Sequence, residues 1–405
     1  MNTSSAIITP HRLSAQSRLA YCHIDGSRDL RLDFLRGLIM LVVITVHMEY
    51  FSLFSMIAWG RVGYVSSAEG FVALSGIVLG IVYKKRIVRE GFKNSAFKLW
   101  KRAFQLYRVN IFVILSIALL GTLSFVNIFE VTHWVPIHAK DQVYPLYPPI
   151  SASWTEIIQQ ALLLRIGPHQ FQVIGLYVGF IAISPLLLFC LHRQKTLLLI
   201  ASSWSLFLIN QKLHLRITGA QFEWGFPSLT WQLLFINGMA IGYHNEKILG
   251  YIVEPKNKAL IVFAGLASLS FLFISLNNPN AIFWPWQTFS YIDPTYHHQI
   301  YLAWFQKTTL GLGRIANNVA IFIMLYYTLN RYWLPINKML GWLLIPLGQA
   351  SLYVFILHVY FIILVSNTSL GEYNSFLVNT AIHASTILLI WIMVKYKVFF
   401  QIIPR

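Results

Sequence analysis

Residues 33–54 read DFLRGLIMLVVITVHMEYFSLF, an apolar run with only a few ionisable side chains in it. A helix needs roughly 20 mostly apolar residues to cross the hydrocarbon core of a bilayer, and this stretch is long enough. Arg36 and His47 both lie inside it. Ionisable groups at membrane depth are costly, so they mark functional sites unless packing explains them. The stretch therefore predicts a membrane-spanning helix that carries chemistry.

The composition of the whole chain agrees with this interpretation. Of its 405 residues, 57% are hydrophobic and 11% are charged, whereas a soluble domain carries about a quarter charged residues. We therefore expect an all-α polytopic integral membrane protein with about ten transmembrane helices. The nine further candidate spans are Ser66–Tyr83, Arg108–Phe125, Phe171–Leu191, Thr196–Asn210, Leu229–Tyr243, Ala259–Leu276, Leu310–Leu329, Ile345–Val365 and Phe376–Val394.

The formal net charge of +17 follows this topology. If the N-terminus lies inside, most basic residues fall in cytoplasmic segments, above all between the second and third spans, as the positive-inside rule requires. We therefore expect both termini in the cytoplasm and the protein in a bacterial inner membrane, and nucleic-acid binding is not needed to explain the charge. The predicted outside loops hold Arg61, Lys140, Arg165, Lys212, Arg216 and Lys307.

The chain reads as one domain. Residues 1–32 are polar and lack a cleavable signal, so we expect a flexible cytoplasmic tail, followed by a single transmembrane domain over residues 33–400. Two long outside loops, residues 127–170 and 277–309, are rich in Trp and Tyr. They fit either an interfacial aromatic belt or a platform for sugar rings. Two cysteines and no metal-binding motif lead us to expect no metal.

The first span carries the strongest set of polar residues. Arg36 and His47 are 11 residues apart, close to three helical turns, so they share one face about 16 Å apart along the axis. Asp33 is at contact spacing from Arg36 and could orient its guanidinium. Glu69 opens the second span at the expected level of His47, where a carboxylate would orient a general base. The alternatives are a snorkelling arginine, a packed histidine and a helix-start carboxylate.

Other polar candidates are weaker. Arg102 and Arg108 could hold the phosphates of a cytosolic coenzyme, because guanidinium groups bind phosphate oxygens in a bidentate way. Membrane orientation and contact with anionic lipid explain most of the surrounding basic cluster equally well. The remaining candidates, each more typical of packing or capping when taken alone, are His169, Gln170, Trp231, Gln232, Lys307, Arg314 and His358.

Several motifs are shared with a known family. RDLRLDFLRG at residues 28–37, followed by His47, resembles the opening of OpgC-type membrane proteins, which belong to the acyltransferase-3-like group. The chain departs from the family at Ile174–Tyr177, where a Leu-Pro-Leu-Tyr sequence after an acidic residue is expected. Further matching segments are AEGFVALSG at residues 68–76, WQLLF at 231–235, KTTL at 307–310 leading to Arg314, and GQASLYVF at 348–355.

The resemblance implies O-acyl transfer from cytosolic acyl-CoA to a hydroxyl of a periplasmic glucan or another cell-envelope glycan, with succinyl as the family's acyl group. It implies no tightly bound cofactor. Membrane lipids, acyl-CoA, the glycan acceptor and glycan-synthesis proteins are the expected partners. Two other functions stay open: a transporter or flippase for a polar solute, which would use the buried charges as a path, and a non-catalytic scaffold of a glycan-synthesis complex.

The spacing of the residues and the resemblance together suggest roles for individual residues. His47, oriented by Glu69, would deprotonate the acceptor hydroxyl or carry the acyl group transiently. Arg36, with Asp33 beside it, would complete the catalytic set. The residues in or beside the matched segments that would contact substrate are His169, Gln170, Trp231, Gln232, Lys307 and Arg314.

Overall fold

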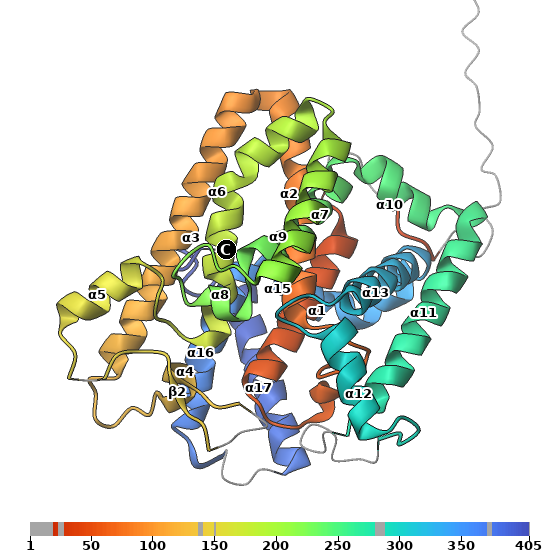
Figure 1. Ribbon diagram of the computed structural model, residues 1–405. Coiled ribbons are helices and arrows are strands. Elements are labelled where there is room, and N and C mark those ends of the chain that lie inside the picture. The colour runs from red at the N-terminus through yellow and green to blue at the C-terminus, as the bar shows by residue number, and fades with distance from the viewer. Residues whose placement is uncertain are drawn as a thin grey trace, which may run out of the picture.

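The computed structural model describes residues 19–22, 28–136, 141–149, 151–279, 288–370 and 375–404. Apart from one short pair of strands, their regular structure is helical (Figure 1). The helices that form the bundle are α1 (Leu30–His47), α2 (Ser67–Glu90), α3 (Phe92–Leu120), α6 (Gln172–His192), α7 (Thr196–Leu213), α9 (Ser228–Tyr243), α11 (Lys258–Leu276), α13 (Leu312–Arg331), the short α15 (Trp342–Gln349), α16 (Ser351–Ser366) and α17 (Phe376–Lys395). The shorter ones used below are α4 (Phe129–Thr132), α5 (Trp154–Leu162), α8 (Phe222–Gly225), α10 (Asn245–Val253), α12 (Pro294–Ile300) and α14 (Trp333–Ile336).

The membrane character of the chain is confirmed, although not its full topology. Five helical segments are long and apolar enough to cross a bilayer: Phe92–Leu120, His169–His192, Pro255–Leu276, Leu312–Arg331 and Phe376–Lys395. The pair Trp333–Gln349 and Ser351–Ser366 is bent by 90° and is either a broken sixth span or a re-entrant loop. Each of the ten predicted stretches overlaps at least one helix, and Ile345–Val365 covers both α15 and α16. Ten spans and two cytoplasmic termini stay predictions.

Glycines let the central helices approach one another closely. Gly37 of α1 lies against the backbone of Leu344, and Gly348 of α15 lies against the backbone of Asp33, where a Cβ on either glycine would overlap a carbonyl oxygen. The pairing of α2 with α9 uses Gly76 and other glycines of both helices in the same way. Small residues at such contacts favour helix association in membranes. They bring α1 and α2, which carry the four predicted catalytic residues, into the middle of the bundle.

The bend between α15 and α16 occurs at Ala350 and interrupts one predicted span. Backbone that leaves the helical path at membrane depth is tolerated where protein surrounds it. The side chains on either side of the bend both reach α1: Gln349 donates to Asp33 at 3.3 Å, and Ser351 accepts a hydrogen bond from Arg36. Contacts with α1 therefore stabilise the bend.

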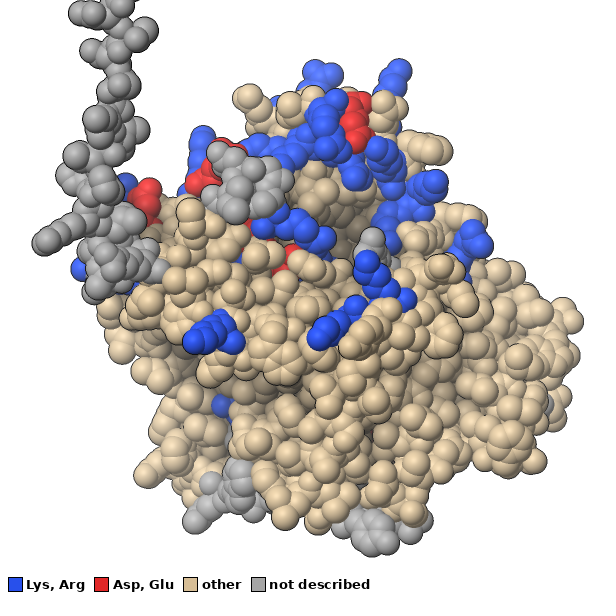
Figure 2. All heavy atoms as spheres, turned by 180° about the vertical axis from the view of Figure 1, so that it is seen from behind, with Lys and Arg blue, Asp and Glu red and all other residues tan. Residues whose placement is uncertain are grey.

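Basic side chains collect at one end of the molecule, which we call the basic end and define by the turn between α2 and α3, at the top of Figure 1. Figure 2 shows the same concentration of Lys and Arg from behind, with the lower half almost free of them on that face. The uneven distribution is the one on which the predicted orientation rests. The basic residues of the α2–α3 region are Lys84, Lys85, Arg86, Arg89, Lys93, Lys98, Lys101 and Arg102.

The predicted tail and the first long loop both contain ordered segments. Residues 1–18 and 23–27 lie outside the described residues. Between them, the backbone N–H of Tyr21 donates to the carbonyl oxygen of Asn330, and the carbonyl oxygen of Leu19 accepts from the N–H of Leu334. Because α1 begins at Leu30, the boundary of the tail at residue 32 is too late. The loop over residues 127–170 contains α4, α5 and a two-stranded antiparallel pair, β1 (His133–Trp134) and β2 (Tyr144–Pro145).

Candidate functional site

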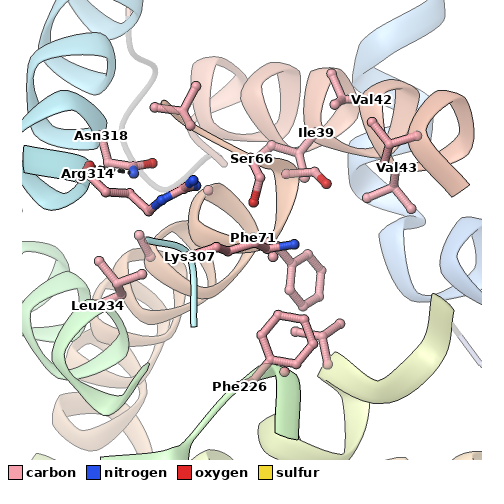
Figure 3. Close-up of a pocket in the computed structure, with 18 of the residues that line it drawn as sticks. Ile39, Val42, Val43, Ser66, Phe71, Phe226, Leu234, Lys307, Arg314 and Asn318 are labelled. Carbon is pink, nitrogen blue, oxygen red and sulfur yellow. Dashed lines mark hydrogen bonds between the residues drawn. The ribbon is translucent and has the colours of Figure 1, made fainter. Parts of the chain in front are cut away.

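A single large cavity dominates the described part of the chain. Its volume is about 2410 Å³, and its walls come mainly from α1, α2, α9 and α13. It extends from Tyr144, far from the basic end, to Tyr251 on α10. Most of the lining is apolar, as Figure 3 shows for one part of it. The polar and ionisable lining residues discussed below are His47, Glu49, Ser66, His169, Gln170, Lys307, Arg314 and Asn318.

His47 lines this cavity at the end of α1 and is held by a second histidine. Its Nδ1 lies 2.9 Å from Nε2 of His358 on α16, and Nδ1 of His358 lies 2.7 Å from the carbonyl oxygen of Phe355. A carbonyl oxygen can only accept, so His358 carries its proton on Nδ1. In the neutral rings, Nε2 of His358 then accepts from Nδ1 of His47. This leaves Nε2 of His47 with a free lone pair, as a base needs.

A third histidine lies beside this pair. The ring of His169 meets that of His47 edge-on, with 6.5 Å between their centroids. Nε2 of His169 lies 3.9 Å from the carboxylate of Glu49, a distance that suits a charge interaction better than a hydrogen bond. The neighbouring Gln170 is buried and donates to the carbonyl oxygen of Glu130 at 2.8 Å. His169 therefore joins the site, whereas the Gln170 amide mainly anchors the loop that carries α4.

The predicted pairing of Glu69 with His47 is wrong. Glu69 accepts hydrogen bonds from the backbone N–H of Ser66 at 2.8 Å, from the Ser66 hydroxyl, and from Arg314 at 2.8 Å. Both partners of the ion pair are almost fully buried, and Arg314 also donates to the carbonyl oxygen of Phe305 at 2.7 Å. Glu69 thus caps α2 and holds Arg314 of α13, and His358 takes the place beside His47 that we assigned to it.

Lys307 presents its ammonium group to the cavity (Figure 3). Its Nζ lies 5.7 Å from the ring centroid of Phe226, and no described residue forms a hydrogen bond or ion pair with it. Burial lowers the pKa of Lys307 below its ordinary value. Nearby Glu69 opposes this shift and Arg314 adds to it. His47 and His169 both lie within electrostatic range of this ammonium. The cavity therefore has an uncompensated cation near the histidines.

The predicted orientation of Arg36 by Asp33 is also wrong. Asp33 accepts two hydrogen bonds from Arg28, at 3.1 and 2.8 Å, and a third from Gln349. Half-buried Arg36 instead donates to the hydroxyl of Ser351 on α16. The i, i+3 spacing did bring Asp33 near Arg36. The carboxylate of Asp33, however, is bonded to Arg28, just before α1, and to Gln349, which is far away in sequence.

The two arginines predicted to hold phosphates do not act together. Arg102 is half-buried, donates to Gln105 at 2.8 Å and lies within electrostatic range of Arg36 and Tyr177. Arg108 is exposed on α3, with its guanidinium 5.9 Å from the ring centroid of Phe104. Only Arg102 therefore belongs to the polar cluster around Arg36.

Trp231 and Gln232 support the site without lining the cavity. Trp231 is fully buried, and its indole N–H donates to the carbonyl oxygen of Thr308 at 3.2 Å. That bond fixes the loop that carries Lys307. Gln232 is bonded to Ser203 of α7, at 2.7 and 2.8 Å, so it joins α9 to α7.

Sequence reasoning gave too little weight to His358 and missed an aromatic layer. Phe355 of α16 stacks on Phe71 of α2, with 5.6 Å between ring centroids. Along α16 it lies between Ser351, which contacts Arg36, and His358, which contacts His47. The layer therefore separates the Arg36 cluster from the cavity. In the described part of the chain, no group of three or more His, Cys, Asp or Glu residues is arranged to hold a metal ion.

The chain was also compared with known proteins. A family model described as "OpgC protein" matches residues 28–401. Neither the curated proteins nor the solved structures contain a match. The matched region contains all the residues of the candidate site.

Proposed function

This chain belongs to the OpgC family, and we propose that it is a membrane O-acyltransferase. The donor is a cytosolic acyl-CoA, the transferred group is succinyl or a related acyl group, and the acceptor is a hydroxyl of a cell-envelope glycan. The observation that carries the proposal is the hydrogen-bonded pair His47–His358, which leaves Nε2 of His47 as a base in a large cavity.

In the proposed reaction, Nε2 of His47 takes the proton of the acceptor hydroxyl while the oxygen attacks the thioester carbonyl. The carbon–sulfur bond breaks, and the departing thiolate receives the same proton from His47, so no net proton is released or consumed. His358 accepts the Nδ1–H of His47 throughout and stabilises the imidazolium that forms. If the acyl group passes through His47 covalently, the same Nε2 atom is the nucleophile.

The two substrates would approach from opposite sides of the aromatic layer. Arg36 and Arg102 offer guanidinium groups suited to the phosphates of the coenzyme, and the many basic residues favour a cytoplasmic position for the basic end. The thioester would then have to pass Phe71 and Phe355 to reach His47. This arrangement corresponds to a multi-pass inner-membrane enzyme whose two termini are cytoplasmic.

The acceptor side of the cavity has the aromatic surfaces that sugar rings use. Trp134 and Tyr144 of the paired strands both line it, and their ring centroids are 5.5 Å apart. Pyranose C–H faces pack on such rings, which favours a glycan acceptor. An aromatic belt at the membrane interface requires no such position at the cavity.

The test uses membranes from cells that produce wild-type protein, His47→Ala, or His192→Ala as an exposed control at the end of α6. Mass spectrometry of the envelope glycans measures the acyl increment. We expect it in wild type and His192→Ala and expect it to be lost in His47→Ala at equal protein level. Normal acylation in His47→Ala would sink the enzymatic proposal, because neither a transporter nor a scaffold needs this base.

A further inference from the structure

The cavity continues past the histidines into a cleft between α9 and α13, and this cleft is apolar. Leu234 and Ile241 of α9 line one wall, Val319 and Phe322 of α13 line the other, and Ile39 of α1 closes the space between them. α13 has the length and composition of a membrane span. The apolar walls therefore lie at the depth of the hydrocarbon core, between helices that enclose the site.

A space of this kind does not stay filled with water. An enclosed apolar cavity of about 150 Å³ stays dry and binds benzene, and this cleft is the apolar part of a cavity that measures about 2410 Å³ as a whole. Most of its wall offers no hydrogen-bond partners, so hydrocarbon is the favourable content. The amides and phosphates of a coenzyme suit it poorly, and Arg36 and Arg102, which suit phosphates, do not line it.

The end of the cleft near His47 carries a positive charge. The Lys307 ammonium faces the space there, and no described residue pairs with it. Glu69, a carboxylate within electrostatic range of Lys307, is already bonded to Arg314 and Ser66. Asn318 also lines this end, but its amide N–H₂ donates to the carbonyl oxygen of Arg314 at 2.8 Å. Glu49 also lines this end, and its carboxylate lies 3.9 Å from Nε2 of His169. The Lys307 ammonium has no ion-pair partner among the described residues, and it favours an anionic group.

We propose that the cleft binds an anionic phospholipid, with an aliphatic chain between α9 and α13 and its phosphate at Lys307. This goes beyond the proposed acyl transfer, because lipid binding needs neither a donor nor an intact His47. The bound lipid would form the wall of the cavity opposite His47, and the acceptor would reach the imidazole across its head group.

The test uses the full-length protein in nanodiscs that contain phosphatidylglycerol with a photoreactive diazirine in one chain. Phosphatidylcholine with the same chain is the matched lipid. We expect phosphatidylglycerol to label α9 and α13 peptides several-fold more than phosphatidylcholine does. Val319→Trp, which fills the cleft, should lower that labelling at least tenfold. The matched control is Val262→Trp on α11, because both valines are exposed, at 53% and 60%, but only Val319 lines the cleft.

A third variant tests the charge. Lys307→Met should abolish the preference for phosphatidylglycerol and leave labelling by phosphatidylcholine unchanged. Equal labelling by the two lipids in wild type, or labelling that survives Val319→Trp, would overturn the proposal. Protection by added acyl-CoA would also overturn it, because the cleft would then be the donor's channel. His47→Ala should label like wild type, so a failed acyltransferase assay does not bear on this result.

Discussion

Nδ1 of His47 and Nε2 of His358 lie 2.9 Å apart, although 311 positions separate the two residues in sequence. The contact joins α1 to α16, and the same two helices meet again where Arg36 donates to Ser351. α16 therefore holds both polar residues of the functional face of α1. The positions of the proposed base and of the proposed phosphate ligand are coupled through one helix.

His358 is expected to act as a positioning residue for His47. Replacing it with Ala removes the acceptor for the Nδ1–H of His47 and should lower kcat roughly 10²-fold, within the range of general-base contributions. KM for the acyl donor should stay unchanged. His358→Gln, whose side-chain oxygen can accept the same hydrogen bond, should recover part of kcat.

Steady-state kinetics on purified protein in detergent micelles would measure this. His244→Ala is the control, because His244 is bonded to Thr196 on the other side of the bundle, at 2.9 Å, and does not line the cavity. Wild-type kcat in His358→Ala would contradict the positioning role. An equal loss in the Ala and Gln variants would show that packing, not the hydrogen bond, matters at this position.

The sequence predicts the helices well because apolar length is a local property. The expected span Phe376–Val394 and the observed α17, Phe376–Lys395, agree almost residue for residue. The expected span Ile345–Val365, in contrast, is not one straight helix, because it contains the bend at Ala350. Contacts of Gln349 and Ser351 with α1 stabilise that bend, and no local pattern contains them.

The same distinction explains which site predictions failed. Helical periodicity places Arg36 and His47 on one face, and both do contact the same helix, α16. Periodicity does not say which helix covers that face, so the partners of His47 and Glu69 could not be derived. Glu69 was expected near His47 because it opens the second span at the level where His47 lies on the first, yet Arg314, 245 positions away, takes its carboxylate.

The buried ion pair between Glu69 and Arg314 gives a prediction about stability. Replacing either residue with its neutral Gln counterpart leaves the other charge buried and unpaired, which should cost about 3–5 kcal/mol of unfolding free energy. The double variant Glu69→Gln/Arg314→Gln should lose less than the sum of the single losses. Reversible unfolding in mixed micelles would measure all three. Strictly additive losses would show that the two side chains do not interact.

Arg102 and Arg108 form a natural pair of test and control for donor binding. Arg102 lies with Arg36 and Tyr177, whereas Arg108 is exposed beside Phe104. A hydrogen bond to a charged group contributes about 1.5–3 kcal/mol, so Arg102→Gln should raise KM for acyl-CoA roughly tenfold or more. Arg108→Gln should leave KM unchanged. A larger effect of Arg108→Gln would place the coenzyme on the other face of α3.

The glycine contacts between α1 and α15 should govern both stability and activity. A Cβ at Gly37 would overlap the carbonyl oxygen of Leu344, so Gly37→Ala must push the two helices apart, at a cost of about 1–3 kcal/mol. Since Gly37 follows Arg36 directly, the displacement also moves the guanidinium away from Ser351. We therefore expect a lower melting temperature together with a raised KM for acyl-CoA.

The control is Gly179→Ala in α6, where a Cβ would meet nothing within 4 Å. Because alanine has the higher helix propensity, by about 0.8–1.0 kcal/mol, this variant should melt at or slightly above the wild-type temperature and keep its KM. If Gly37→Ala had the same melting temperature as the control variant, α1 and α15 could not be in backbone contact. Arg36 would then lack the fixed position that coenzyme binding at this cluster requires.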